Sequence, residues 1–366
     1  MRRDLVGCLS CPVCRGPLEV AASRESHGEV ETGTLTSRCG AVFPIADFVP
    51  SFFRAEALSD ADRRMLADGE YWSGFYGFYD DAGYRYFIDS RTDPAPLLFQ
   101  GILRRLSLGS RADLAHLHEP HYRDFFSPAA AGALPPGAVV FEAGCGSGWL
   151  TLELARQGCR AIGQDTARGA LVRAKRQALA EGVAADYLHA SSLALPLQSG
   201  TLDAFVGFQA LHHFEALDQT LGRVNDALKP DAPVVIFEHR RPRPPKLHKI
   251  AVALERLSLP LIRRRFPPTG KADWMASPAE DTATADMDQT IRDAFAIAHE
   301  VSYSLFLQPV PAYAYFLSGE RPGAFAVVAR AVNAVDRQIA RRWPDKCEHR
   351  LYLGRRRATP VPPAGA

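Results

Sequence analysis

The chain has 366 residues, of which 47% are hydrophobic and 23% are charged, so it is long enough to bury a substantial core. Its 43 Lys and Arg residues nearly balance its 41 Asp and Glu residues, and a net charge of +2 is too small to require a nucleic-acid partner. No window has the roughly 18 uninterrupted apolar residues of a membrane span, and the N-terminus lacks an apolar run of signal-peptide length. We therefore expect a globular, cytoplasmic protein with one main domain and additions.

Residues 1–53 are expected to form a first unit, in which four of the seven cysteines crowd into the first 39 residues. In a reducing compartment this crowding indicates a metal site more than disulfides. Cys11 and Cys14 have the C-x2-C spacing of a zinc knuckle, whose turn directs two thiolates at one ion. Cys39 could belong to a second knuckle, but Thr36 stands where its partner cysteine is expected.

Three interpretations of this unit are open. Zinc could be bound by Cys11, Cys14 and Cys39, with Cys8 or His27 as the fourth ligand. The spacing of Cys8, Cys11 and Cys14 also fits an iron–sulfur run. Without any metal, the unit would have to be stabilised by docking on the larger domain. Whether or not the unit binds zinc, the residues expected to pack in it are Leu18, Phe43, Ile45, Phe48 and Val49.

Residues 54–130 are predicted to be an aromatic-rich helical linker or lid. Tyr, Phe and Trp are concentrated in residues 71–87 (YWSGFYGFYDDAGYRYF), and residues 96–106 have a helical pattern. This density suits a pocket for an apolar or aromatic molecule. Ordinary packing between domains explains it equally well.

Residues 131–358 are predicted to form an α/β domain, because short apolar runs alternate with helical patterns between residues 135 and 239. The strands are expected at 139–143, 159–165, 186–190, 202–208 and 233–239. Beyond them the pattern predicts a strand at 298–307, a long helix at 324–343 and a final strand at 348–354. Residues 359–366 are a Pro- and Ala-rich segment that we expect to be a flexible tail.

The first strand is followed by a glycine-rich turn in the run VVFEAGCGSG, residues 139–148. Glycines remove Cβ atoms from the concave side of such a turn, so that backbone N–H groups and a helix N-terminus can approach a ligand. The pattern is not a dinucleotide fingerprint, because Trp149 occupies the position of the third glycine, and no phosphate-loop lysine follows. Glu142 would also repel phosphate, although it suits a cationic ligand. Asp165, which ends the next strand, is placed to accept hydrogen bonds from ribose hydroxyls.

With these residues the chain resembles the class I S-adenosylmethionine-dependent methyltransferases of type 11/25. The matching motifs are FEAGCGSG, GQD, LALPLQSGTLDAFV, QALHHF and VNDALKP, in the order and spacing of the family. The resemblance covers about residues 120–240. It implies a Rossmann-like sheet that is mostly parallel with an antiparallel last strand, and S-adenosyl-L-methionine as the cofactor.

The resemblance also implies the cofactor-binding residues. Glu142 and the glycine turn would hold the methionine part, Asp165 the ribose, and Ser191 would lie beside the adenine. The full set is Glu142, Gly144, Cys145, Gly146, Gly148, Asp165, Thr166, Ser191, Ser192 and Gln209. The family commonly has Asp at position 191 to bond the adenine amino group, whereas Ser191 offers a hydroxyl that Ser192 could assist. A second departure is Asp231-Ala232, where the family usually has Gly-Gly.

The N-terminal unit resembles the Trm112-like zinc-ribbon domain that precedes some methyltransferase domains. The motifs that carry this resemblance are CPVCRGPLEV, CGAVFPI and FVP. It implies a small zinc ribbon whose second knuckle is degenerate. The candidate ligands of Zn²⁺ are Cys8, Cys11, Cys14 and Cys39.

Methyl transfer is an in-line displacement, so most of the catalysis can come from holding the nucleophile near the methyl group, and a general base is optional. Candidate bases should follow the fourth and fifth strands, at the edge where ligands bind such sheets. His213 is the first candidate and His239 the second, followed by His212 and Glu238. Each of these side chains could instead have a packing or hydrogen-bonding role. No Asn/Asp-Pro-Pro-Tyr/Phe motif follows the fourth strand, which favours O- or C-methylation over transfer to a planar nitrogen.

Three functions compete at this point. A small-molecule methyltransferase is favoured by the aromatic segment. An rRNA or tRNA base methyltransferase ranks lower, because residues 1–53 carry few Lys or Arg residues. A non-catalytic module that docks a partner protein is left open by Ser191, although the intact glycine turn, Glu142 and Asp165 oppose it.

Overall fold

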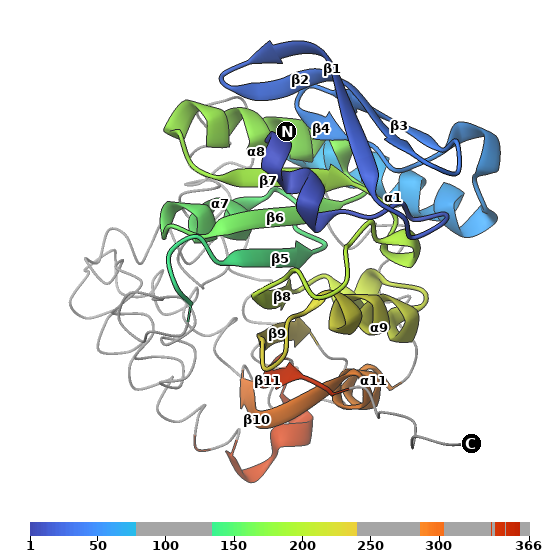
Figure 1. The fold of residues 1–366 in the computed structure, drawn as a ribbon. Coiled ribbons are helices and arrows are strands. Elements are labelled where there is room, and N and C mark those ends of the chain that lie inside the picture. The colour runs from blue at the N-terminus through green and yellow to red at the C-terminus, as the bar shows by residue number, and fades with distance from the viewer. Residues whose placement is uncertain (78–133, 240–285, 304–337, 339–340, 348, 359–366) are drawn as a thin grey trace, which may run out of the picture.

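The computed structural model describes residues 1–77, 134–239, 286–303, 338, 341–347 and 349–358. Most of the aromatic linker, the helix expected at 96–106, nearly all of the helix expected at 324–343 and the tail 359–366 lie outside these ranges. The described chain contains two sheets, one with the strand order β1-β2-β3-β4 and one with the order β10-β11-β9-β8-β5-β6-β7 (Figure 1).

The larger sheet confirms the predicted α/β fold. Its parallel strands are β5 (Val139–Ala143), β6 (Arg160–Asp165), β7 (Ala185–His189), β8 (Ala204–Phe208) and β9 (Pro233–His239). The strand order reverses at β5, which pairs with both β6 and β8. A ligand-binding crevice is expected at the carboxyl ends of the strands at such a reversal.

The last strand is antiparallel, as expected. β11 (His349–Arg356) lies between β9 and β10 (Phe295–Tyr303) and runs antiparallel to both. β10 begins earlier than the expected residue 298, because helix α11 (Met287–Ala294) ends directly before it. A 3-10 helix, η6 (Pro344–Lys346), precedes β11.

Helices cover both faces of the sheet. α7 (Trp149–Arg156) and α8 (Arg168–Glu181) pack on the face that contains Val140 and Val206. α9 (Leu217–Ala227) and α11 pack on the opposite face, with Phe141 and Phe205. Successive strand residues alternate between the two faces, so two covered faces explain why these strands are almost continuously apolar. Among the described residues, no helix has both the length and the apolar character needed to cross a membrane.

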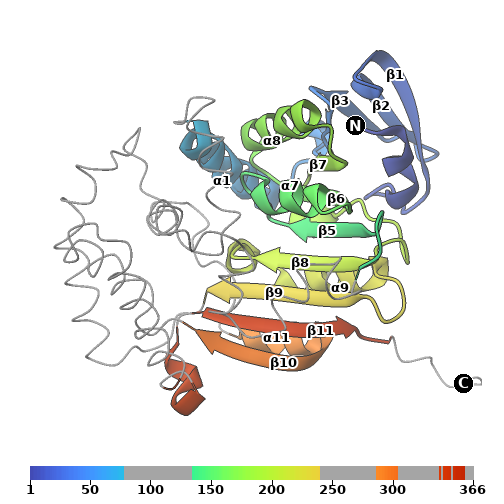
Figure 2. The same ribbon diagram turned by 90° about the vertical axis from the view of Figure 1, so that its left-hand side faces the viewer.

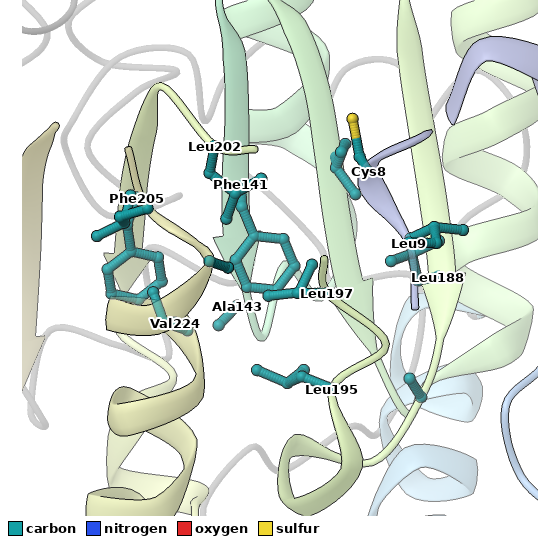
Figure 3. Close-up of a cluster of buried hydrophobic side chains, with 14 of the residues drawn as sticks. Cys8, Leu9, Phe141, Ala143, Leu188, Leu195, Leu197, Leu202, Phe205 and Val224 are labelled. Atoms are coloured by element: carbon teal, nitrogen blue, oxygen red, sulfur yellow. The ribbon is translucent and has the colours of Figure 1, made fainter. Parts of the chain in front are cut away.

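The N-terminal unit is an antiparallel sheet preceded by a short helix. Its elements are the 3-10 helix η1 (Arg3–Cys8), β1 (Leu18–Ser26), β2 (Glu29–Ser37), β3 (Val42–Ala46) and β4 (Val49–Pro50). All five residues expected to pack in this unit, Leu18, Phe43, Ile45, Phe48 and Val49, are buried. Figure 3 shows that Cys8 and Leu9 extend this core toward Leu188 and Leu197 of the larger domain.

The N-terminal unit docks on the β7 edge of the large sheet, where Figure 1 shows it in blue. Ser51 forms a bridge with His189 of β7, and the Phe52 N–H donates to the His189 carbonyl at 2.8 Å. Arg2 Nε lies 2.7 Å from Asp186 Oδ2, and the pairing of Lys175 with Glu29 is similarly close at 2.6 Å. Docking therefore covers an edge strand that would otherwise expose unpaired backbone groups.

Helix α1 (Asp60–Gly77) follows the unit after the short 3-10 helix η2 (Ala55–Ala57) and packs on α8. A Cβ atom at Gly69 would lie 2.2 Å from the Thr166 carbonyl oxygen, so glycine permits the close approach of the two chains here. The Gly169 N–H donates to Ser73 Oγ at 3.1 Å. α1 is thus fixed beside the loop that follows β6.

Candidate functional site

The glycine turn between β5 and α7 has a left-handed backbone at three positions. The φ angles are +65° at Gly144, +53° at Gly146 and +73° at Gly148. A Cβ atom at Gly144 would lie 2.4 Å from Ala210 Cβ, and one at Gly148 would lie 2.6 Å from Ala174 Cβ. Both the backbone conformation and the space therefore require glycine at these two positions.

Backbone N–H groups of the turn are used inside the protein. Cys145 donates to the Gln164 carbonyl at 2.9 Å, and Gly148 donates to the Cys145 carbonyl at 2.8 Å. The Gly146 N–H donates to Asp165 Oδ2 at 2.8 Å. These three groups are committed and do not form an anion-binding nest. The internal acceptors of these three N–H groups agree with the exclusion of pyrophosphate.

Asp165 ties the end of β6 to the glycine turn. Its Oδ2 accepts from Gly146, and its Oδ1 accepts from the Ala167 N–H at 2.8 Å. Burial raises the pKa of Asp165, which these hydrogen bonds partly offset. Each carboxylate oxygen has a second lone pair, so the side chain can still accept hydrogen bonds from two hydroxyl groups. Thr166, which follows, is covered by Gly69 of α1.

Glu142 is buried under the turn, with 2% of its surface exposed. Thr151 Oγ1 of α7 donates a hydrogen bond to its carboxyl group. Burial raises the pKa of Glu142 to about 8, and the charge of Asp165 acts in the same direction against the hydrogen bond from Thr151. Near neutral pH this carboxyl group is therefore mostly protonated until a cation approaches it.

The raised pKa of Glu142 predicts a pH-dependent stability. The folded state retains a proton that the unfolded chain releases near 4.5, so this group stabilises the fold at low pH, and the contribution is lost as pH rises through about 8. Glutamine has no proton to release, so we expect the free energy of unfolding of Glu142→Gln not to show this fall, which is on the order of a few kcal/mol. Urea denaturation from pH 5 to about pH 9 measures it, with exposed Glu19→Gln as the control. Parallel curves for wild type and Glu142→Gln would contradict the assignment.

The Cys145 thiol is buried and faces inward. A Cβ atom built at Gly163 of β6 would lie 2.8 Å from Cys145 Sγ, so the thiol packs between the turn and the sheet. Burial also raises the pKa of this thiol well above its ordinary value. Cys145 therefore contributes packing and its backbone to the turn.

Ser191 and Ser192 follow β7 and are both buried beneath α1. Their hydroxyls lie 3.7 Å and 3.5 Å from Met65 Sδ. Ser191 Oγ also accepts from the Leu193 N–H at 3.2 Å and caps the 3-10 helix η3 (Ser192–Ala194). Helix α1 therefore covers the two serines that are predicted to lie beside the adenine.

Gln209 follows β8 in a strained conformation, with φ of +48°, a region that non-glycine residues seldom adopt. Its N–H donates to the Phe237 carbonyl at 2.7 Å. The strain lies at the carboxyl ends of the central strands, where the crevice is expected.

Glu238 holds the chain that follows Gln209. The Glu238 side chain is fully buried. Its Oε1 accepts hydrogen bonds from the N–H groups of Ala210 at 2.8 Å and Leu211 at 2.7 Å. Its Oε2 lies 2.9 Å from His212 Nδ1. Burial alone would raise the pKa of Glu238, but His212 and the two N–H donors lower it below its ordinary value. For Glu238 and His212, this arrangement therefore favours a hydrogen-bonding role over the role of a general base.

His213 is half-buried at the end of the 3-10 helix η4 (Leu211–His213). Its ring centroid lies 4.3 Å from that of His212 and 5.9 Å from that of Trp72, which meets it edge to face. Trp72 belongs to the aromatic segment and is brought to the histidine by α1. His239 is the last residue of β9, opposite His349 of β11, and its side chain lies outside the described residues.

The thiols of Cys11, Cys14 and Cys39 form a cluster in the N-terminal unit, with all three sulfurs within 4.8 Å of one another. Cys11 and Cys39 are 3.8 Å apart, and tetrahedral zinc with bonds of about 2.3 Å separates two sulfurs by about 3.8 Å. Cys14 Sγ lies 3.2 Å from Ser37 Oγ, and hydrogen bonds from Ser37 and the backbone lower the pKa of the Cys14 thiol to about 6. The donor set therefore fits zinc.

The expectation that Cys8 or His27 supplies a zinc ligand is wrong, because neither belongs to the cluster among the described residues. Cys8 ends η1 and turns into the apolar core beside Leu9 (Figure 3). His27 has a left-handed backbone between β1 and β2 and packs edge to face on Phe48. The iron–sulfur interpretation is also wrong, because it needs Cys8 beside Cys11 and Cys14. Ser37 is the polar side chain that the structure brings to Cys14 instead.

The comparison with known families decides what the larger domain is. Residues 140–231, from β5 to the turn before β9, match the family described as a methyltransferase domain. Residues 140–231 are a class I S-adenosylmethionine-dependent methyltransferase domain. The glycine turn and Asp165 both lie within this match.

Curated relatives of the methyltransferase domain have related names. The chain is 27% identical over 153 residues to a ubiquinone biosynthesis O-methyltransferase of Dinoroseobacter shibae, covering 42% of this chain and 59% of that protein. It is 32% identical over 109 residues to a demethylmenaquinone methyltransferase of Thermus thermophilus, covering 29% of this chain and 49% of that protein. The chain thus spans about half of the curated relatives it matches.

Solved structures resemble the chain only weakly overall. A geranyl diphosphate C-methyltransferase from Streptomyces coelicolor A3(2) has a TM-score of 0.41 and 15% identity, covering 67% of this chain and 82% of that chain. The family assignment therefore depends on the sequence match and on the strand order.

Proposed function

We propose that this chain is an S-adenosylmethionine-dependent methyltransferase that acts on a small molecule, with O- or C-methylation favoured. The left-handed glycine turn joined to Asp165 inside a methyltransferase domain is the observation that carries the proposal. The names of the curated relatives, an O-methyltransferase of ubiquinone biosynthesis and a demethylmenaquinone methyltransferase, support a small-molecule acceptor.

Within this proposal the described residues divide the work of holding the cofactor. Glu142 and the glycine turn hold the methionine part, and the ammonium group of that part would favour the ionised form of Glu142. Asp165 with Thr166 holds the ribose, while Ser191 and Ser192 lie beside the adenine. When bound, S-adenosylmethionine supplies an electrophilic methyl group.

His213 remains the first candidate for a general base toward an acceptor hydroxyl. It follows β8 at the carboxyl ends of the parallel strands, next to the aromatic ring of Trp72. Glu238 accepts hydrogen bonds from the N–H groups of Ala210 and Leu211 and contacts His212 Nδ1, and these contacts fix the backbone that presents His213. A fixed side chain at this edge can hold the acceptor in line as well as accept its proton.

Asp165→Ala tests the cofactor assignment. We expect it to weaken binding of S-adenosylhomocysteine by about 1–3 kcal/mol, because two ribose hydroxyls lose a charged acceptor. Isothermal titration calorimetry on the full chain measures this, with exposed Asp218→Ala as the matched control. If wild type binds and Asp165→Ala binds equally well, the ribose assignment is wrong. If wild type does not bind, the proposed function fails and the non-catalytic alternative gains support.

We also propose that the N-terminal unit binds one structural Zn²⁺ through Cys11, Cys14 and Cys39. The 3.8 Å separation of Cys11 and Cys39 supports this proposal. Ser37 Oγ, beside Cys14, is the candidate for the fourth ligand. Such a site would join the turn after η1 to the turn between β2 and β3.

A further inference from the structure

The three clustered thiols of the N-terminal unit differ in their exposure to solvent. Cys11 is fully buried, Cys14 is half-buried and Cys39 is exposed. Cys39 lies in the turn between β2 and β3, and its neighbours Arg38 and Gly40 are exposed as well. Figure 2 shows this unit beyond β7, at the opposite end of the large sheet from β10. A small polar molecule can therefore reach Cys39 from solvent, whereas Cys11 is shielded.

Cys11 lies directly behind the exposed thiol. Its Sγ is 3.8 Å from Cys39 Sγ, and a disulfide bond of about 2.05 Å requires the two sulfurs to approach each other by less than about 2 Å. The Cys11 backbone is held in place, because its N–H donates to the Gly16 carbonyl at 2.9 Å and its carbonyl accepts from the Arg15 N–H at 2.8 Å. The turn of Cys39 has room for the approach, since a Cβ atom at Gly40 would meet nothing within 4 Å. The geometry thus suits a bond between these two sulfurs.

Cys14 has a different neighbour. Its Sγ lies 3.2 Å from Ser37 Oγ, on the far strand end from the exposed turn. A Cβ atom built at Gly16 would lie 3.4 Å from Cys14 Sγ and 3.2 Å from Arg38 Nε, so the guanidinium group packs on the same turn as the thiol. An arginine beside thiols is typical of the surroundings of reactive cysteines. The cluster therefore combines an exposed thiol, a shielded second thiol and a cationic side chain.

We propose that Cys11 and Cys39 are a reversible oxidation site, which hydrogen peroxide converts to a disulfide. The Cys39 thiolate attacks the peroxide, so that an S–O bond forms, the O–O bond breaks and hydroxide leaves. The Cys11 thiolate then attacks the oxidised sulfur; the S–S bond forms, the S–O bond breaks and a second hydroxide leaves. Each hydroxide takes up one of the protons that the two thiols released. The thiols lose two electrons in total, which reduce one peroxide to two waters.

The oxidation would also dismantle the proposed zinc site. Cys11 and Cys39 are two of its three thiolate ligands, and a disulfide sulfur has no negative charge with which to hold Zn²⁺. This consequence rests on the proposed zinc site, whereas formation of the disulfide does not. A dithiol reverses the reaction by attacking the exposed sulfur of Cys39.

Peptide mapping of the full chain, alkylated after treatment with hydrogen peroxide, tests the proposal. Trypsin cuts after arginine, which gives one peptide of residues 4–15 and one of residues 39–54. We expect a disulfide-linked pair to become the main form of both peptides and to disappear after treatment with dithiothreitol. A chromophoric chelator should detect close to one equivalent of released zinc per chain over the same period. Fragmentation of the linked pair identifies the bonded cysteine, because the first peptide also contains Cys8 and Cys14.

Variants provide a second assignment of the pair. Cys11→Ser and Cys39→Ser should each abolish the linked peptides, whereas Cys14→Ser should retain them, and thermal melts establish that each variant is folded. Absence of the linked pair from oxidised wild type, or a bond from Cys39 to Cys14 instead of Cys11, would overturn the inference. A linked pair in a wild-type chain that contains no zinc would support the oxidation site and refute the zinc site.

Discussion

Replacing Glu238 with alanine should lower the free energy of unfolding by about 3–5 kcal/mol. The carboxylate is fully buried and accepts from Ala210, Leu211 and His212. Its removal leaves two buried N–H groups and an imidazole without this acceptor, and each unsatisfied group costs about 1–3 kcal/mol. The loss is therefore much larger than for a carboxylate at the surface.

Chemical denaturation measures this loss, with two comparisons. Glu238→Gln keeps a carbonyl oxygen for the N–H groups of Ala210 and Leu211 and disturbs mainly the contact with His212, so it should cost less than alanine. Exposed Asp218→Ala should change stability by less than about 0.5 kcal/mol. A change below about 1 kcal/mol for Glu238→Ala would show that the surrounding backbone finds other partners.

The position of Glu238 also has a consequence for activity. The backbone that it holds leads directly into His213, and the half-buried ring of His213 packs against Trp72. Loosening this turn should therefore lower turnover even in the fraction of Glu238→Gln that is folded. Cofactor affinity should change less, because Asp165 and the glycine turn lie on neighbouring strands.

The sheet was predictable from the sequence because its strands are apolar on both sides. Apart from Glu142, the runs at Val139–Ala143 and Ala204–Phe208 are apolar on both faces, which indicates burial between two helical layers. The turn was equally predictable from its glycines, since their spacing reflects a backbone conformation that only glycine adopts easily. Local pattern and tertiary structure agree at these positions.

Contacts between residues far apart in the sequence were not predictable. Glu238 looked like a candidate base, because periodicity places it at a strand end but does not reveal donors from residues 210–212. Cys8 has ligand spacing, yet η1 directs its thiol into the core.

Removing zinc should destabilise the N-terminal unit. The purified chain should contain close to one zinc per molecule, and a chelator should increase hydrogen exchange around the turns that carry Cys11, Cys14 and Cys39. Structural zinc sites in small peptides bind with about 10–16 kcal/mol of apparent free energy, which is coupled to folding. The contribution here should be smaller, because docking through Ser51 and Phe52 also holds the unit.

Site variants separate the metal from the packing. Cys11→Ser should lose the zinc, whereas Cys159→Ser, at a buried cysteine outside the cluster, should retain it. Ser37→Cys should bind zinc more tightly than wild type if Ser37 is the fourth ligand, because a thiolate replaces a hydroxyl. Far less than one equivalent of zinc in wild type, together with exchange rates that a chelator leaves unchanged, would show that the unit is held by apolar packing and docking alone.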